Sequence, residues 1–537
     1  MSRTAFPRVI GLAFLAFIGG TGCAGAESSA DPPALRVKPE SGGIVPPVAD
    51  EWAKVPVPPE NGPQLAPIAM TVPVRSKPLS GAEIIGYLRV GARVARSEKP
   101  VTLRDCPGGW YAVRPVGFVC VGPEATVKLD HPVARALSVE PDRSKPMPYQ
   151  YAFLRAIAPN YLRVPTKAEQ FQYEMRLERH LRNWKKLRED WDALDVGAND
   201  VPLDERGLAK GAIPDHARPM DESVRFGGSG DDRLPWWLDG SRRIPNLSSF
   251  KAPPYAVIAD RSRRHAGFAL IGTFVAGPEA QNRRFAITTD ARLLPADKLK
   301  ADSGSPFHGA DIRNIGLPLA FVRAEKAYFY TLAGGRMEKG ESVERRALVP
   351  LTGTVRGSGD TRMVETRDGR WLKSADLRTV PKSSTLPPFA KKGNKWIDVS
   401  ILNQTLVLWE GDRPVYATLV STGKDGLGDP AKTHSTPTGT FRIFQKHVTT
   451  TMDSAVADHE FELRDVPWVQ YFKGGYAIHA AYWHDDFGKS RSHGCVNLSP
   501  IDARYVFFWS TPGVPEHWHG GYAGESLEAG TTVSIHP

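Results

Sequence analysis

Two histidines and a cysteine near the C-terminus have the types and the spacing that nucleophilic chemistry needs. His479 lies 16 positions before Cys495, and His493 lies two positions before it. A cysteine attacks a carbonyl carbon as the thiolate, so it needs a base or a local field that lowers its pKa. Gly494, between His493 and Cys495, lets backbone N–H groups approach a developing oxyanion. The segment therefore predicts that Cys495 is a nucleophile with a histidine base.

The sequence around these residues resembles the signature of the L,D-transpeptidase catalytic domain, the YkuD-like family. That signature is a histidine, a gap of roughly a dozen or more residues, Ser/Thr-His-Gly-Cys, a hydrophobic residue, and Asn or Arg. It is filled here by His479, Ser492, His493, Gly494, Cys495, Val496 and Asn497. Residues 420–424 and 435–441 resemble the strand-and-turn segments that lead into the family's site. The resemblance spans roughly residues 395–537.

The resemblance implies a role for each residue of the motif. Cys495 is the expected nucleophile and His479 the general base, and the Gly494 and Cys495 backbone amides are the expected oxyanion hole. Ser492 is expected to orient the loop through its hydroxyl. Two roles are open to His493, which either polarises the thiol or holds the loop by hydrogen bonding. Ala480 follows the base where the family has a small polar residue or glycine, which leaves a backbone carbonyl to orient the ring.

Four further residues are candidates for substrate binding. Tyr482 and Trp483 closely follow the base, where they form either a wall over the acyl chain or ordinary core packing. Arg491 precedes the motif and could meet a substrate carboxylate, although an exposed arginine is the simpler explanation. Asn497 either holds the turn or contacts substrate.

The resemblance also implies a substrate, the stem peptide of peptidoglycan. Cys495 would attack the L-centre carbonyl of meso-diaminopimelate and release the terminal D-alanine. The side-chain amine of a second stem would then resolve the thioester into a 3→3 cross-link. Water as acceptor would instead make the enzyme an L,D-carboxypeptidase or a wall hydrolase. A non-catalytic alternative is a wall-binding lipoprotein whose catalytic domain is silent.

The motif suggests no metal or cofactor. His484, Asp485 and Asp486 lie between His479 and His493 and invite a metal interpretation. Their order lacks the tight helical spacing of a zinc protease, and metal ligation would quench a cysteine nucleophile. We therefore expect neither a metal nor a cofactor.

The N-terminus predicts export. Arg3 and Arg8 precede an apolar run over residues 9–18, and small residues follow to residue 26. This pattern is typical of a secretory signal peptide over residues 1–26 and is too short for a mature transmembrane helix. Cys23 follows Thr-Gly, where a bacterial lipobox places the lipidated cysteine. Lipidation at Cys23 and ordinary cleavage after residues 24–26 are both open, so the protein is expected in the periplasm or cell envelope, with a membrane lipid anchor as one possibility.

The remaining cysteines support the same assignment. Cys106 and Cys120 are 14 positions apart in a β-rich stretch, which in an exported protein predicts a disulfide. Loop-closure arithmetic gives such a bridge about 3 kcal/mol. This pairing leaves Cys495 as the odd cysteine, and an unpaired thiol in an oxidising compartment is a liability unless it has a function.

Composition limits the range of partners. The chain has 537 residues, of which 41% are hydrophobic and 24% charged, and its formal net charge is +10. That length predicts several domains, and the positive charge suits an anionic surrounding such as a cell wall or membrane surface. Because the chain lacks a long Lys/Arg run and any nucleic-acid motif, we expect no nucleic-acid partner.

The organisation predicted along the chain is mainly β. A Pro-rich tether over 27–65 precedes short strands and Gly-Trp turns over 66–127, which resemble a bacterial SH3-like barrel. A second SH3-like unit is expected over 315–380, from a first strand at 318–322 to a closing strand at 369–372. A linker over 381–394 then leads into a mostly antiparallel, YkuD-like β-sandwich over 395–537, with a helix at 500–509.

The stretch between the two SH3-like units has a mixed pattern. Residues 146–310 have strand-like ends around a charged helical segment, predicted as one helix over 166–195 that begins at a Thr166–Glu169 capping box. We interpret this stretch as a mixed domain and possibly a third SH3-like unit with a helical insertion.

Overall fold

The computed structural model describes residues 51–187, 193–214, 218–219, 221–245, 247, 252–383, 385–454, 461–524 and 529–537. The predicted signal peptide, Cys23 and the first part of the Pro-rich tether lie outside these residues. Strands far outnumber helices, as the predicted fold class requires. Within the described ranges, no helix is both long and apolar enough to cross a membrane.

The C-terminal catalytic domain is built on two sheets and one buried helix. One sheet has the strand order β17-β27-β26-β25-β34-β28, formed by β17 (Ala310–Asp311), β25 (Lys395–Ser400), β26 (Thr405–Glu410), β27 (Arg413–Leu419), β28 (Gly439–Arg442) and β34 (Thr532–His536). The second contains β29 (Gln445–Ser454), β30 (Phe461–Lys473), β31 (Tyr476–Ala480), β32 (Val496–Leu498) and β33 (Gly520–Tyr522). Helix α5 (Pro500–Trp509) covers the residues predicted for it, capped by the Ser499 hydroxyl, and joins one hydrophobic core with both sheets.

The first unit, residues 51–127, extends the second sheet. It contains β1 (Gln64–Pro67), β2 (Thr71–Arg75), β3 (Ile84–Arg89), β4 (Val94–Ala95), β5 (Trp110–Ala112), β6 (Phe118–Cys120) and β7 (Ala125–Thr126). Cys106 and Cys120 form a disulfide with a Cα–Cα distance of 5.8 Å. Strand β3 pairs with β33, so this unit is joined to the catalytic domain by backbone hydrogen bonds. Its SH3-like assignment stays a prediction.

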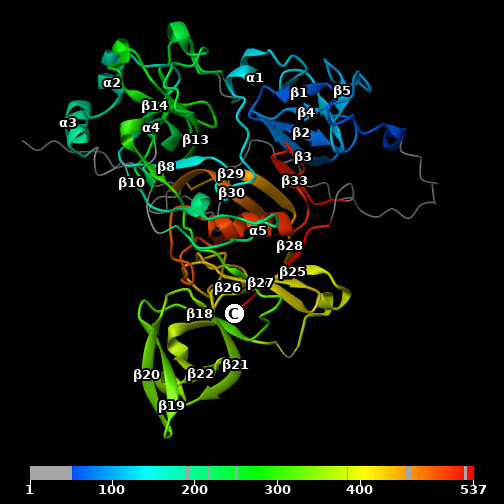
Figure 1. Ribbon diagram of the computed structural model, residues 1–537. Coiled ribbons are helices and arrows are strands. Elements are labelled where there is room, and N and C mark those ends of the chain that lie inside the picture. The colour runs from blue at the N-terminus through cyan, green and yellow to red at the C-terminus, as the bar shows by residue number, and fades with distance from the viewer. Residues whose placement is uncertain are drawn as a thin grey trace, which may run out of the picture.

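Residues 146–302, here called the inserted unit, also join the second sheet. After α1 (Pro132–Ala136), the chain forms β8 (Gln150–Leu154) and β9 (Ala158–Tyr161), and it returns as β12 (Ile258–Ser262), β13 (Gly267–Val275), β14 (Arg284–Thr288), β15 (Leu293–Pro295) and β16 (Leu299–Asp302). Strand β13 pairs with β8 and runs parallel to β30 at Gly267 and Leu463. The inserted and first units lie side by side on one side of the catalytic domain (Figure 1).

The single helix predicted over 166–195 is wrong. The predicted capping box is present and starts α2 (Lys167–Tyr173), but α2 ends at Glu174 and a second helix, α3, covers Leu177–Leu187. Arg176, between them, has a φ of +56°. Glu174 is 1% exposed, and its carboxylate contacts Arg283 and Lys298 at 2.7 and 2.8 Å. Because a buried carboxylate needs cationic partners, these contacts explain why the helix breaks there.

The rest of the inserted unit contains short elements. Strand β10 (Ala193–Leu194) occupies the end of the segment predicted as helical and pairs with β11 (Arg218–Pro219). Helix α4 covers Glu222–Arg225.

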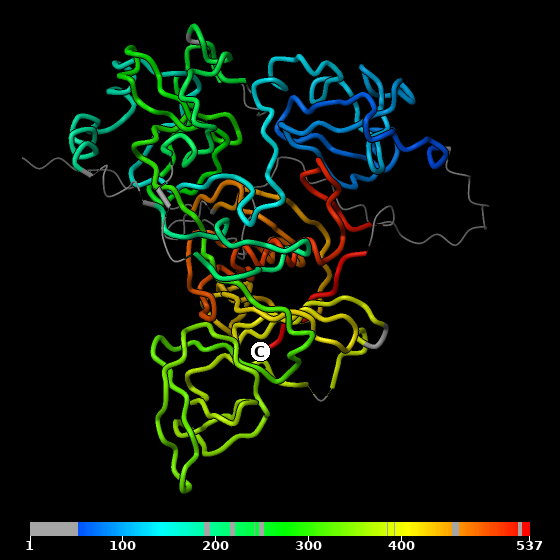
Figure 2. Tube along the Cα trace, viewed as in Figure 1, coloured from blue at the N-terminus to red at the C-terminus, as the bar shows by residue number. Residues whose placement is uncertain are grey.

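The fourth unit is a seven-stranded antiparallel sheet on the opposite side of the catalytic domain (Figure 1). Its strands are β18 (Leu319–Val322), β19 (Ala327–Ala333), β20 (Arg336–Val343), β21 (Leu348–Arg356), β22 (Met363–Thr366), β23 (Trp371–Lys373) and β24 (Leu377–Val380). The predicted closing strand corresponds to β23, but the last strand is β24, and β18 lies between β21 and β24 in the sheet. The chain reaches this unit by crossing the catalytic domain, where β17 pairs with β27 (Figure 2).

A buried ion pair lies where the first unit, the inserted unit and the catalytic domain meet. Asp465 on β30 is 3% exposed and forms a two-point contact with Arg89 on β3. Thr289 of the inserted unit and Thr449 on β29 also donate to this carboxylate. Burial alone would raise the pKa of Asp465, but the charge and hydrogen bonds of Arg89 lower it to about 2. The ion pair therefore holds a full negative charge at the junction of three units.

Removing this charge should destabilise the fold. Asp465→Asn leaves Arg89 buried without its carboxylate, so we expect the free energy of unfolding in urea to fall by about 3–5 kcal/mol. Asp105→Asn is a matched control, because Asp105 and Asp465 have similar positive φ values of 53° and 55°. Among the described residues, Asp105 forms an ion pair only with Arg104, on an exposed surface. The free energy of unfolding should therefore fall only slightly in Asp105→Asn. Equal losses in the two variants would contradict the prediction.

The same pair makes stability depend on acid pH. The folded pKa of Asp465, about 2, is lower than the value of an unfolded aspartate. The contribution of the Asp465 carboxylate to the free energy of unfolding is therefore complete above about pH 4, and it is lost as the pH falls toward about 2. We expect urea titrations between about pH 5 and about pH 2 to show a smaller loss of stability in Asp465→Asn than in the wild type. Parallel curves for the two proteins would contradict this assignment.

Candidate active site

Parallel pairing of β31 with β32 brings together the histidine and the cysteine of the motif. Ile478 pairs with Val496 and His479 with Asn497, so Cys495 directly precedes the strand that lies beside the histidine. Cys495 is fully buried, is not part of a disulfide, and its Sγ lies 3.8 Å from the Gly475 carbonyl oxygen. The 15 residues between His479 and Cys495 therefore return the chain to an adjacent strand, which is the arrangement that a nucleophile and its base would require.

The backbone holds His479 in the tautomer that a base needs. Its Nδ1 donates to the Ala480 carbonyl oxygen at 2.9 Å, which leaves the lone pair on Nε2. Burial lowers the pKa of His479 to about 4, and the hydrogen bond to Ala480 opposes this only in part. The ring is therefore neutral near pH 7 and able to accept a proton. The carbonyl at position 480 is the orienting group that the sequence predicted.

The loop before Cys495 is fixed by its own serine. The Ser492 hydroxyl donates to the Cys495 carbonyl oxygen at 2.5 Å and accepts from the Gly494 N–H at 3.1 Å. The Gly494 N–H is therefore bonded within the loop, which differs from its predicted role as an oxyanion donor. Gly494 instead contributes its conformation, with a φ of +116°, and a Cβ there would meet the Tyr476 ring at 2.6 Å.

His493 lies in an aromatic setting at the cavity. Its ring stacks on Phe461 with centroids 5.2 Å apart and meets His434 edge-on at 4.7 Å. The side chain also lines the cavity with Cys495. These contacts hold the imidazole ring of His493 at the cavity that Cys495 also lines.

Asn497 and His484 form a polar contact behind the base. The Asn497 side-chain amide lies 3.1 Å from His484 Nε2, and the Asp486 N–H donates to His484 Nδ1 at 3.2 Å. Both side chains are largely buried, and burial lowers the pKa of His484 to about 3. Because His479 and Asn497 face each other across β31 and β32, this contact supports the base. Sequence reasoning considered His484 only as a metal ligand, and no local signal predicts its contact with Asn497.

The carboxylates next to His484 are bound by cations. Asp485 forms an ion pair with Arg346 of the fourth unit at 2.9 Å, and Asp486 contacts Arg491 and Lys489. In the part of the chain that the structure describes, no group of three or more His, Cys, Asp or Glu side chains is arranged to hold a metal ion.

A cavity of about 890 Å³ opens onto Cys495. Trp483 and Arg491 line it together with His479 and Asn497, and the Trp483 ring lies 5.8 Å from His479. Of the two positions left open for Trp483, wall and core, the structure places its side chain in the cavity wall.

Tyr482 is not one of the lining residues, which corrects its prediction as a substrate contact. It is 2% exposed and packs on Tyr151 and Phe153 of β8, with ring centroids 4.5 and 5.4 Å away. Tyr482 and Trp483 lie in the turn that follows β31, and there Tyr482 faces the core while Trp483 lines the cavity.

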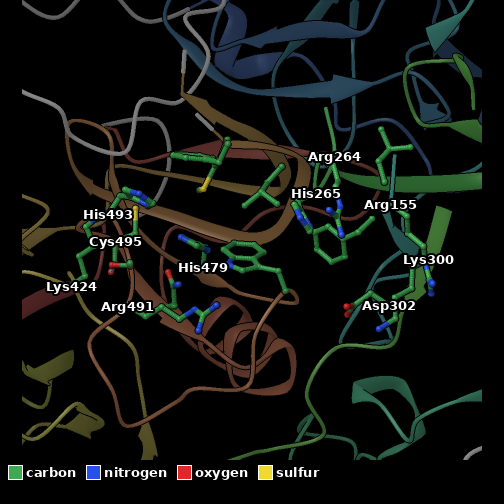
Figure 3. Close-up of a pocket in the computed structure, with 18 residues that line it drawn as sticks. Arg155, Arg264, His265, Lys300, Asp302, Lys424, His479, Arg491, His493 and Cys495 are labelled. Carbon is green, nitrogen blue, oxygen red and sulfur yellow. Dashed lines mark hydrogen bonds between the residues drawn. The ribbon is translucent and has the colours of Figure 1, made fainter. Parts of the chain in front are cut away.

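The far side of the cavity belongs to the inserted unit. Its lining residues there are Phe153, Leu154, Arg155, Arg264, His265, Lys300 and Asp302 (Figure 3). Sequence reasoning missed all of them. They are distant from the motif in sequence, and only the pairing of β13 with β30 brings them to the site.

Comparison with known proteins assigns the C-terminal domain. Residues 394–535 match the family model of the L,D-transpeptidase catalytic domain (YkuD). This part of the chain is therefore an L,D-transpeptidase catalytic domain. Over 203 residues the chain is 25% identical to "Putative L,D-transpeptidase YciB" of Bacillus subtilis (strain 168), a match that covers 33% of this chain and 86% of that protein.

Solved structures of other L,D-transpeptidases resemble parts of the chain. The catalytic domain of the E. faecium L,D-transpeptidase is 21% identical, with 27% of this chain and 98% of that chain covered and a TM-score of 0.20. The L,D-transpeptidase of Xylanimonas cellulosilytica is also 21% identical, with 29% of this chain covered and a TM-score of 0.20. The match spans only 64% of that second structure, and the assignment above rests on the family model and the sequence match.

Gly494 should be required for activity. In Gly494→Ala, the new Cβ clashes with Tyr476 and strains the backbone, which displaces the nucleophile. For the reaction proposed below, we expect acylation of Cys495 by a disaccharide-tetrapeptide to slow roughly 10²-fold or more. Gly474→Ala is the control, because its φ is +49° and a Cβ there meets nothing within 4 Å. Similar rates in the two variants would refute a special role for Gly494.

The neutral state of His479 can be measured directly. In Cys495→Ala, which removes the thiol as a titrating neighbour, the imidazole NMR signals of His479 should stay constant from about pH 8 to about pH 5.5, because its pKa is about 4. A matched spectrum of Cys495→Ala/His479→Gln identifies the signals. A midpoint near the ordinary histidine value would show that burial does not control this ring.

Proposed function

We propose that the protein is a peptidoglycan L,D-transpeptidase in which Cys495 forms an acyl-enzyme. The single observation that carries this proposal is the register of β31 and β32, which brings His479 and Cys495 together at one cavity. The donor is a tetrapeptide stem that ends in meso-diaminopimelate and D-alanine. The product is a 3→3 cross-link between two stems.

The first half-reaction transfers the acyl group to the enzyme. His479 Nε2 takes the Cys495 thiol proton, and the sulfur attacks the L-centre carbonyl of meso-diaminopimelate. The Cys495 backbone N–H is the donor we assign to the oxyanion, with the loop held by Ser492. Collapse forms the thioester and breaks the peptide bond, while His479 returns its proton to the departing amine of D-alanine.

The second half-reaction returns the free thiol. The side-chain amine of a second stem attacks the thioester carbonyl and gives a proton to His479. A C–N bond forms, the C–S bond breaks, and the proton goes back to sulfur. Burial makes the imidazolium of His479 costly, so it is favoured only while the thiolate or oxyanion lies beside it.

The proposal includes a place of action. Peptidoglycan lies outside the cytoplasmic membrane, so the predicted signal peptide over 1–26 and lipidation at Cys23 would place the enzyme at the cell envelope. The Cys106–Cys120 disulfide supports an oxidising compartment. The first and fourth units, which we interpret as SH3-like, would hold the domain against the wall.

Mass spectrometry with a disaccharide-tetrapeptide tests the proposal. We expect a covalent adduct on Cys495 with loss of D-alanine, followed by a cross-linked dimer. Cys495→Ala should form neither product, because no other residue in the motif can make a thioester. His479→Gln should slow adduct formation roughly 10²–10⁴-fold.

The products also decide between acceptors. A dimer means that an amine resolves the thioester, whereas a tripeptide alone means that water does. The absence of any adduct on wild-type Cys495 would refute the proposed function.

A further inference from the structure

The cavity at Cys495 has two differently built ends. Cys495, His479 and Lys424 come from the catalytic domain, and the opposite wall is formed by β8, β16 and the turn between β12 and β13. In Figure 3 the labelled residues of the inserted unit gather across the cavity from Cys495 and His493, with His479 between the two groups. A substrate that fills this cavity therefore contacts the inserted unit as well as the catalytic domain.

The opposite wall is positively charged. Arg155, Arg264 and Lys300 line it, and among the lining residues that the structure describes Asp302 is the only carboxylate. Arg264 and Lys300 are exposed and Arg155 is half-buried. Burial lowers the pKa of Arg155 only to about 10, so it remains a cation near pH 7. Burial also raises the pKa of Asp302 to about 6, so its carboxylate is still mostly ionised near pH 7 and offsets one of the three cations. The wall therefore has a net positive charge.

Backbone pairing fixes where these cations lie. Lys300 pairs with Phe153 across β16 and β8, and the Arg155 N–H donates to the Lys298 carbonyl oxygen at 2.9 Å. The turn that carries Arg264 is tied to β8 by the His265 N–H, which donates to the Leu154 carbonyl oxygen at 2.7 Å. The three cations thus come from three adjacent segments of one sheet.

The wall is also fixed relative to the base. Tyr482, three residues after His479, packs on Tyr151 and Phe153 of β8. Gly267, next to the turn, pairs with Leu463 on β30, and a Cβ at Gly267 would meet the Tyr482 hydroxyl at 2.4 Å. Such close packing leaves little freedom for the wall to move away from the catalytic domain.

We propose that Arg155, Arg264 and Lys300 of the inserted unit form a carboxylate-binding subsite that holds a peptide stem across the cavity from Cys495. This inference rests on the proposed function, because peptidoglycan stems are short peptides with free carboxylates. Guanidinium groups bind carboxylates through two parallel hydrogen bonds, and an ammonium adds a point charge. The bound carboxylate belongs either to the donor stem or to the acceptor stem. In both cases the inserted unit determines which peptides reach the nucleophile.

A binding experiment tests the subsite without requiring turnover. In the Cys495→Ala background, calorimetry with a disaccharide-tripeptide should give a Kd roughly 10-fold or more higher when Arg264→Glu and Lys300→Glu are added. Arg179→Glu/Arg182→Glu is the matched control, since both arginines are exposed on α3 of the same unit and the charge change is equal. Arg264→Lys/Lys300→Arg should retain most of the affinity. Equal Kd values for the wall and control variants would overturn the proposal.

Kinetics with Cys495 present then separate donor from acceptor. If the wall holds the donor, Arg264→Glu/Lys300→Glu raises the tetrapeptide concentration needed for half-maximal acylation. If it holds the acceptor, acylation is unchanged and the ratio of dimer to tripeptide falls. Either result supports the subsite, and no change in both would overturn it.

One further control separates the failure of this inference from that of the proposed function. Iodoacetamide, which is uncharged, should alkylate Cys495 at the same rate in the wild type and in the Arg264→Glu/Lys300→Glu variant that retains Cys495. A wild type that binds the tripeptide through the wall but never forms an acyl-enzyme would refute the proposed function and leave the subsite standing. If an acyl-enzyme forms, and neither its formation nor the ratio of dimer to tripeptide depends on the wall, the proposed function stands and the subsite is refuted.

Discussion

A single buried charge, the carboxylate of Asp465, determines how three parts of the chain meet. Arg89 comes from the first unit, Thr289 from the inserted unit and Thr449 from the catalytic domain, and all three bind this carboxylate. A buried ion without partners costs several kcal/mol. Moving the first unit or the inserted unit away from Asp465 would therefore be unfavourable. The Tyr151 hydroxyl also donates to the Asp465 backbone carbonyl at 2.9 Å, which ties β8 to the same point. The cationic wall thus depends on a charge that lies outside the catalytic motif.

The placement of His479 and Cys495 at one cavity could be predicted from the sequence because their geometry is local. His479 and Cys495 are close in the chain, and the motif between them determines that they return to adjacent strands. The helix Pro500–Trp509 was predictable for the same reason, since its Ser cap and its first proline mark its start. Local residue patterns can specify such features because the interactions that form them are made by near neighbours.

Features that depend on distant contacts could not be predicted. The helix expected over 166–195 breaks because Glu174 is bound by Arg283 and Lys298, more than 100 positions away. Tyr482 turns into the core because β8 offers it two aromatic rings. Propensity and periodicity describe what a segment prefers alone, and in these places the tertiary contacts decide the outcome.

The site that local sequence specifies and the wall that distant contacts build also differ in their chemical roles. The catalytic domain buries His479 and Cys495, and burial keeps the histidine neutral until a negative partner develops beside it. Such a setting favours proton transfer. The catalytic domain adds Lys424 and Arg491 to the cavity lining, and Arg491 is paired with Asp486. The inserted unit adds its three cations at the opposite wall without placing a cation against the base. The separation between these cations and His479 matters, because a cation close to His479 would lower the pKa of the imidazole still further and weaken it as a base.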